Sequence, residues 1–418
     1  MSDDSKGKPR VQEPRRNQGV IRFEMPEDAL EPTHRARILW DVTGTLELGL
    51  FLAGVKAVEG TVGRKTLSPR MKLVLWLYAI SEGIGSAREV ERRVASDTAY
   101  RWIVGDLSVG HHTLSAFRVE HGGALDQLMT DILAALMHKG LLSLDLAAQD
   151  GIRIRAAATA PSFRTYGSLL ECREQAALHL KAVLSQADDP ELTLAQKVSR
   201  EAGARDFQRR VEEAITTVVQ LQEQRKPSAK EFARASTTDA EARVMKMADG
   251  GFRPAYNVQM ATAGSPLGGP RTIVGVLVTN LGSDMNSITP MLDQIERRTG
   301  ELPKVLMADA NHAAHDCIRE ATERGVEVLI AVPERQQKSG AHVDADPAIV
   351  AWHERMKTDE AKQLYRARAS LCELSNAHLR THHGVSQFLL RGATKITSMA
   401  LLAAISSNLL QHAAALLR

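Results

Sequence analysis

Residues 304–332 read KVLMADANHAAHDCIREATERGVEVLIAV, and this stretch decides the fold class. The run at 304–308 is short and apolar, as expected of a buried strand. Helical periodicity follows over 311–324, and a second apolar run covers 326–332. A strand, a helix and a strand in this order place the two strands parallel in one sheet, with the helix on a face. The stretch therefore predicts an α/β fold.

The sheet is expected to gain further strands from upstream segments. Runs with strand character lie at 256–262 and 271–279, and a helix is expected at 287–298. Further upstream, two apolar runs at 142–148 and 152–158 flank Gln149-Asp-Gly, which is the pattern of a β-hairpin. A hairpin brings antiparallel neighbours and the strand-helix-strand unit brings parallel ones. Together they predict a mixed sheet with helices on its faces.

Helical segments precede and interrupt this α/β region. Over 38–139 the pattern is helical, with a helix start at Ser68 and Pro69. Short helices joined by tight turns predict a compact bundle that contains a helix-turn-helix-like unit. A second helical stretch, rich in Glu, Gln, Lys and Arg, covers about 168–224 and predicts a helical insertion.

The chain of 418 residues is long enough for two or three domains. We expect a polar, flexible arm at 1–37 and an all-α domain at 38–139. An α/β domain is expected at 140–418, interrupted by the insertion at about 168–224. Ordinary shares of hydrophobic (44%) and charged (25%) residues exclude a largely disordered protein.

Composition also predicts the compartment. The three cysteines lie far apart without the spacing of metal ligands, which is typical of a reducing environment. The N-terminal segment is polar, which predicts neither a signal peptide nor a membrane anchor. Polar residues interrupt the apolar run at 399–417, so we expect a packed helix there and no membrane partner. The protein is expected to be cytoplasmic.

Three acidic residues lie where strand ends and helix starts converge in such a sheet. Asp150 lies at the tip of the expected hairpin, Asp309 follows the strand at 304–308, and Glu373 lies on a late helix. Carboxylates gathered at one edge repel each other unless a hard dication neutralises them, and oxygen ligands suit Mg²⁺ or Mn²⁺. Two such ions support phosphodiester chemistry. The alternative is a structural role for each acid, as a turn cap, a helix cap and a surface charge.

Several short motifs occur in one order along the chain. They are LSPR (67–70), GIGSAR (83–88), AYRWI (99–103), QDGIRIRA (149–156), STTDA (236–240), GGFRPAYNVQ (250–259), VLMAD (305–309), YRARASLCE (365–373) and LRG (390–392). In this combination the chain resembles the DDE transposases of bacterial insertion sequences, from about residue 40 to the end. The resemblance implies a ribonuclease-H-like catalytic core behind a helical domain for DNA-end recognition or dimerisation.

The resemblance also implies a mechanism. Asp150, Asp309 and Glu373 are then the catalytic triad, with two Mg²⁺ or Mn²⁺ ions expected. A metal-activated water attacks a phosphodiester at a transposon end, and the freed 3′-hydroxyl attacks target DNA. The sequence departs from the family at 310–312, where Ala-Asn-His stands in place of a small residue and Gly-Tyr. This departure leaves a non-catalytic DNA-binding relative open as one alternative, and a structure-specific nuclease on the same fold is another.

Basic residues predict where double-stranded DNA, from the transposon ends and the target, is bound. Residues 361–395 carry six Lys or Arg and one acid, a formal balance of 6 − 1 = +5. Binding to phosphates through such a patch is expected to weaken with salt. The alternative to DNA binding is a solvated basic helix at 361–395 and a structural or dimerising bundle in the helical domain. We expect the protein to form a homo-oligomer on DNA, at the nucleoid. The candidate DNA contacts are Arg153, Arg155, Arg366, Arg368, Arg380, Arg391 and Lys395 in the α/β domain and Arg88, Arg92 and Arg118 in the helical domain.

Overall fold

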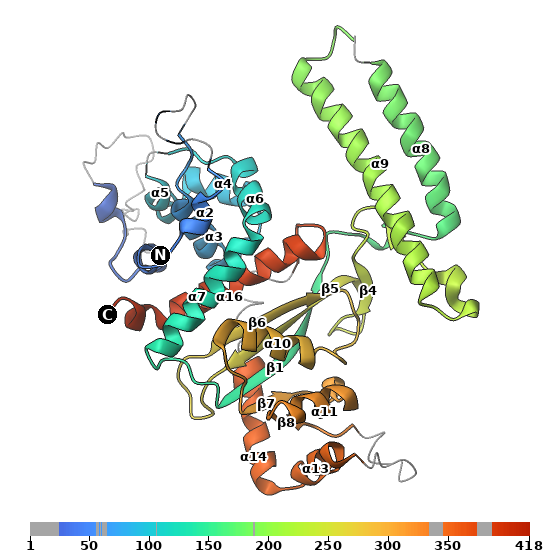
Figure 1. Cartoon of the computed structure of the whole chain (residues 1–418). Helices are drawn as coiled ribbons and strands as arrows, with labels where there is room; N and C mark the ends of the chain where they lie inside the picture. The colour runs from blue at the N-terminus through green and yellow to red at the C-terminus, as the bar shows by residue number, and fades with distance from the viewer. Residues whose placement is uncertain are drawn as a thin grey trace, which may run out of the picture.

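The structure is a computed structural model. It describes residues 25–55, 58, 60, 65–105, 107–186, 189–333, 346–373 and 387–418. Figure 1 shows a cluster of N-terminal helices, a central sheet, and a long two-helix hairpin that projects away from both.

A six-stranded mixed sheet forms the centre, as predicted. Its order is β4-β5-β1-β7-β8, and β6 pairs with β5 on a different stretch from β4. β1 runs antiparallel to β5 and parallel to β7, which is parallel to β8. The strands are β1 (Leu146–Arg155), β4 (Arg243–Lys246), β5 (Phe252–Ala263), β6 (Thr272–Thr279), β7 (Val305–Ala308) and β8 (Glu327–Ile330).

The predicted hairpin around Gln149-Asp-Gly is wrong. β1 continues through these residues and pairs with β5 along its length, so Asp150 lies in mid-strand opposite Met260. An Asp-Gly pair marks a turn when its glycine takes a positive φ, but Gly151 is not among the positive-φ residues. A Cβ at Gly151 would instead lie 2.2 Å from Nε2 of Gln259 and 2.7 Å from Oδ1 of Asp284. Glycine here allows the close approach of buried side chains.

Two smaller differences concern the stretch that decides the fold and a short edge strand. The helix expected from Asn311 begins only at His315, because a 3₁₀ turn, η4 (Ala310–His312), follows β7. The strand β4 was not predicted from the sequence. The strand-helix-strand unit itself is confirmed, with parallel pairing of β7 and β8.

Helices form a cluster ahead of the sheet, as the pattern over 38–139 predicts. Ser68 caps α3, since its Oγ accepts a hydrogen bond from the amide of Met71 at 3.4 Å. Trp76 is fully buried in this cluster, where its indole N–H donates to the carbonyl of Leu114 at 3.0 Å. The helices are α1 (Arg35–Gly44), α2 (Gly49–Leu52), α3 (Pro69–Ser81), α4 (Ala87–Ser96), α5 (Thr98–Val104), α6 (His111–Glu120) and α7 (Gly122–His138).

The helix α16 (Ala393–Leu416) joins this cluster to the sheet. It packs against α1, α3, α7 and β6, and one continuous apolar core runs through all of them. The side chain of Asn408 bonds to both the amide and the carbonyl of Ile273 at 2.8 Å. Among the described helices, α16 alone is long and apolar enough to cross a membrane, but 78% of its apolar window is buried in the protein. It is a packed helix, as predicted.

Helices cover both faces of the sheet. α10 lies on one face, where Met291 fills the space above Gly275. α14 and the short π-helix η5 lie on the opposite face, which carries Ala148 and Met307. α11 and α13 pack beside β8. The bounds are α10 (Ile288–Thr299), α11 (His315–Glu323), α13 (Pro347–Arg355), α14 (Asp359–Arg368) and η5 (Ala369–Glu373).

The helices expected at about 168–224 form the projecting hairpin, α8 (Tyr166–Ser185) and α9 (Leu194–Glu223) (Figure 1). They pack against each other and share a small apolar cluster that includes Leu169, Ala214 and Val218. At their base, a two-stranded pair, β2 (Phe163–Arg164) and β3 (Ala235–Ser236), brings the chain ends of the hairpin together. The hairpin therefore has its own minor core.

Candidate active site

Two of the three predicted acids lie on or directly after neighbouring strands, Asp150 within β1 and Asp309 immediately after β7. The parallel pairing of β1 with β7 matches Ala148 with Met307. Continuing this register by two residues places Asp150 opposite Asp309, on strands about 4.8 Å apart. Because side chains alternate between the two faces of a strand, both carboxylates lie on the face that carries Ala148 and Met307. The sheet therefore brings together acids that are far apart in the sequence.

The third predicted acid, Glu373, ends the π-helix that covers this same face. Leu371 and Cys372 of η5 are buried in one apolar cluster with Leu146 and Ala148 of β1. η5 also contacts β5. The backbone of Glu373 is thus carried to the face of Asp150 and Asp309, while its side chain lies outside what the structure describes.

The environment of Asp150 disfavours its negative charge. Burial raises the pKa of its carboxyl above the ordinary value, and the charge of Asp309 adds to this effect. The amide of Gly151, at 2.9 Å, and the charges of Arg368 and His312 act in the opposite direction without cancelling it. The two carboxylates therefore repel each other in the protein as it stands.

Asp309 is held by donors from the turn that follows it. Its Oδ1 accepts hydrogen bonds from the amide of Asn311 at 3.0 Å and from Nδ1 of His312 at 2.6 Å, and its Oδ2 accepts one from Nδ2 of Asn311 at 2.9 Å. Burial alone raises the pKa of this carboxyl, but the hydrogen bonds outweigh burial and lower it. Asp309 is therefore an ionised carboxylate with a fixed orientation.

A buried polar network extends from this turn, and the sequence analysis missed it. Its members are fully or almost fully buried side chains of β1, β5, the segment before α10 and η4: Gln149, Asn257, Gln259, Asp284, Ser287 and His312. In the sequence, His312 stands out only as part of the departure from the family at 310–312. The signal available in the sequence was Asn257 and Gln259, two amides in a mostly apolar strand.

Two family models match the chain, both of transposases. A transposase domain (DUF772) matches residues 26–120, and a transposase DDE domain matches residues 217–409. The chain belongs to the DDE transposases. The mixed sheet behind a helical N-terminal region confirms the predicted ribonuclease-H-like fold class, and the matches confirm the insertion-sequence family. Asp309 and Glu373 lie inside the second match, whereas Asp150 lies between the two. No curated protein and no solved structure matches this transposase significantly.

The paired carboxylates of the transposase fit a hard divalent cation. Both supply oxygen donors, which suit Mg²⁺ and Mn²⁺ better than softer metals. Burial and, to a smaller extent, the charge of Asp309 raise the pKa of Asp150, and a bound cation would favour the ionised carboxylate. Among the described side chains, no group of three or more His, Cys, Asp or Glu gathers to hold a metal ion. The donors described are thus Asp150 and Asp309, on the face that η5 covers.

Some predicted DNA contacts of the transposase lie close to this pair or face solvent. The guanidinium of Arg368 lies 5.7 Å from the ring of Tyr365, whose hydroxyl donates to the carbonyl of Ala308 at 3.1 Å. The charge of Arg368 lowers the pKa of Asp150, so Arg368 lies within electrostatic range of the acidic pair. Arg366 and Arg155 are exposed, as are Arg88 and Arg92 on α4, and Arg380 lies outside the described residues.

Two other predicted contacts, Arg118 and Arg153, have partners inside the protein. Arg118 is only 4% exposed, and its guanidinium lies 4.5 Å from the ring of Trp76 and donates to the carbonyl of Gly85 at 2.7 Å. Burial lowers its pKa to about 10. Arg153 donates to Asp284 at 3.2 Å. In this structure Arg118 is a packing residue and Arg153 forms an ion pair, and a DNA contact by either stays a prediction.

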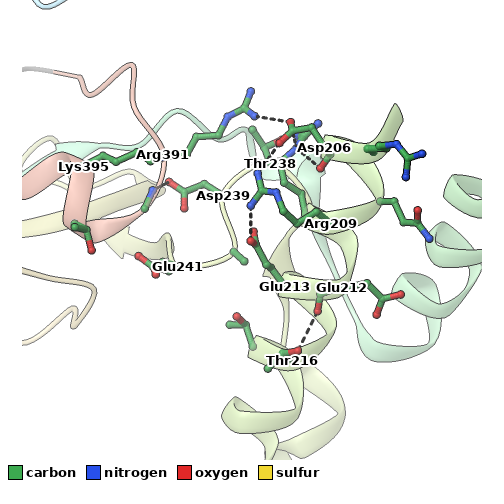
Figure 2. Close-up of a pocket in the computed structure, with 17 residues that line it drawn as sticks. Asp206, Arg209, Glu212, Glu213, Thr216, Thr238, Asp239, Glu241, Arg391 and Lys395 are labelled. Atoms are coloured by element: carbon green, nitrogen blue, oxygen red, sulfur yellow. Dashed lines mark hydrogen bonds and ion pairs between the residues drawn. The ribbon is translucent and has the colours of Figure 1, made fainter. Parts of the chain in front are cut away.

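Arg391 and Lys395 line a cavity of about 970 Å³ between α9 and the start of α16 (Figure 2). None of the three predicted acids lines it. Arg391 faces Asp206 at 3.9 Å, and Arg209 lies between Asp206 and Glu213 (Figure 2). The cationic side chains of the lining, Arg205, Arg209, Arg210, Arg391 and Lys395, are balanced by the carboxylates Asp206, Glu212, Glu213, Asp239 and Glu241. This balance gives the cavity no preference for phosphate.

Proposed function

We propose that the chain is an active DNA transposase, in which Asp150, Asp309 and Glu373 hold two Mg²⁺ or Mn²⁺ ions. The observation that carries this proposal is the register of β1 and β7, which sets Asp150 opposite Asp309 on the face that η5 covers. When bound, the ions supply Lewis acidity to the phosphodiester and to the attacking oxygen. The reaction is cleavage at the transposon ends, followed by attack of the freed 3′-hydroxyl on a phosphodiester of the target DNA, which joins the two DNAs and releases a 3′-hydroxyl of the target.

The chain's own residues have distinct roles in this proposal. Asp150 within β1 and Asp309 directly after β7 would supply carboxylate oxygens to the ions. In this proposal Arg368 neutralises a DNA phosphate that enters near Asp150, and the support is that the charge of Arg368 acts on Asp150. The partner is double-stranded DNA at the nucleoid, and a homo-oligomer brings the two ends of the element together.

The test uses the full-length protein and a supercoiled plasmid that carries the gene with its flanking DNA. We expect wild-type protein with Mg²⁺ to nick the element ends and join them to target DNA. Asp150→Asn, Asp309→Asn and Glu373→Gln should each lower cleavage at least about 10³-fold, because loss of metal-ion catalysis costs several kcal/mol. DNA binding should remain. The matched control is Asp316→Asn, a carboxylate 94% exposed on α11, which should cleave like the wild type.

The same assay separates the two rival functions. DNA retention in a mobility-shift gel without cut products, at any Mg²⁺ or Mn²⁺ concentration, would identify a non-catalytic DNA-binding relative. The residues Asn311 and His312 after the second aspartate motivate that rival. Nicking without joining of the 3′-ends would identify a structure-specific nuclease. Cleavage at the wild-type rate by Asp150→Asn would remove Asp150 from the catalytic site.

A further inference from the structure

His312 connects the proposed metal ligand Asp309 to the interior of the sheet. Its side chain is fully buried. Nδ1 lies 2.6 Å from Oδ1 of Asp309, and Nε2 lies 3.0 Å from Oε1 of Gln259. A buried polar ring is costly unless its nitrogens are paired, and here both are. The imidazole is therefore fixed at both ends, with one end on the carboxylate.

The network behind Gln259 sets the direction of this contact. Nε2 of Gln259 donates to Oδ1 of Asp284 at 2.7 Å and to Oδ1 of Asn257 at 3.2 Å. Its Oε1 consequently faces His312 and also accepts from Nε2 of Gln149 at 3.2 Å. Asp284 is anchored in turn by Nδ2 of Asn257 at 2.7 Å and by Arg153. The hydrogen bonds to Asp284 and Asn257 thus fix the orientation of the Gln259 amide.

We propose that His312 is a positioning residue that sets the orientation of the Asp309 carboxylate toward a divalent cation, with Gln259 and Asp284 holding the imidazole. The proposal rests on the proposed function, because it takes Asp309 as a metal ligand. A carboxylate that is already held by hydrogen-bond partners loses less conformational freedom when it binds a metal ion. Loss of such a partner typically lowers metal affinity about 10- to 100-fold. The other hydrogen bonds to the Asp309 carboxylate come from Asn311, which is exposed. His312 is therefore the buried hydrogen-bond partner of this carboxylate.

A pair of substitutions separates the two ends of the ring. His312→Asn places an amide nitrogen near the position of Nδ1 and keeps a donor for Asp309, while it gives up Gln259. His312→Gln places an amide near the position of Nε2 and keeps Gln259, while it gives up Asp309. Each removes one contact of a fully buried side chain, so both should lose similar thermal stability. They differ in the contact to Asp309, which His312→Asn keeps and His312→Gln loses.

The measurement is Mn²⁺ binding to the full-length protein without DNA, by electron paramagnetic resonance of free Mn²⁺, together with the Mn²⁺ concentration for half-maximal cleavage. We expect His312→Gln to weaken Mn²⁺ binding about 10- to 100-fold. His312→Asn should stay within about threefold of the wild type, as expected when the outer partner is kept. The half-maximal Mn²⁺ concentration should shift by the same factors, and melting temperature is measured for every variant.

Three results would overturn the proposal. One is Mn²⁺ affinity in His312→Gln equal to that of the wild type, while Asp309→Asn has lost it. Another is affinity that follows melting temperature across the variants, which indicates a structural role for the ring. The third is unchanged Mn²⁺ binding in both Asp150→Asn and Asp309→Asn, which removes the metal site itself and is thereby distinguishable from the other two.

Discussion

Substitution of Gly151 by alanine should destabilise the protein strongly, although it adds one methyl group. An added Cβ would lie 2.2 Å from Nε2 of Gln259, 2.7 Å from Oδ1 of Asp284 and 2.9 Å from Oδ1 of Asn257. These atoms belong to side chains that are at most 5% exposed and are hydrogen-bonded to one another. They cannot move apart without breaking those bonds. The added methyl group therefore clashes with side chains that are held in place by hydrogen bonds.

The magnitude follows from two contributions. Overpacking in a buried site costs about 1–3 kcal/mol. Loss or distortion of a hydrogen bond to a charged group, here the carboxylate of Asp284, adds about 1.5–3 kcal/mol. At about 2–4 °C per kcal/mol for domains of this size, the melting temperature should fall by on the order of 10 °C.

The assay is thermal unfolding followed by circular dichroism in the presence of a chelator, with Gly203→Ala as control. Gly203 lies within α9, and an added Cβ meets nothing within 4 Å. Alanine at that position should be neutral or gain about 0.5–1 kcal/mol. A melting temperature for Gly151→Ala within about 2 °C of the wild type, less than a 1 kcal/mol change on the same scale, would refute the reasoning.

Three further predictions follow from the same structure. Asp150→Asn should raise the melting temperature of the metal-free protein at neutral pH, because burial raises the pKa of Asp150 and its ionised form lowers the stability of the fold. Below about pH 4 this gain should vanish, since the wild-type carboxyl is then protonated as well. Arg118→Lys should leave the salt dependence of DNA binding unchanged, whereas Arg368→Gln should lower its slope by about one, as measured by fluorescence anisotropy at several salt concentrations. Replacement of residues 166–232 by a short Gly-Ser linker should leave the remaining chain folded, because Arg164 and Ala235 are already paired; loss of cooperative melting would contradict this.

Local patterns in the sequence predicted most of the elements. The strand-helix-strand unit at 304–332 and the cap at Ser68 depend on neighbours a few residues apart, and both are present. These features need only periodicity and strand order. That Asp150 and Asp309 converge was also expected, but from a hairpin tip that does not form, since Asp150 lies in mid-strand.

Features that depend on distant partners were not predictable in the same way. Asp-Gly at 150–151 has the local pattern of a turn, and only the approach of Gln259 from β5 explains why a glycine lies in mid-strand. Arg118 resembles a surface cation until α3 and α16 enclose it. The role of His312 depends on Gln259, whose orientation is set by Asp284. In each case the deciding contact joins segments that the sequence does not place together.

The position of α16 has a consequence for biosynthesis. The ribosome makes this helix after every other described element, yet α1, α3, α7 and β6 all bury apolar surface against it. A nascent chain that has not yet released α16 therefore exposes those surfaces, which is the condition under which chaperones and proteases act. Translation that stops short of residue 393 should yield a product that is degraded and does not compete for the DNA of the element.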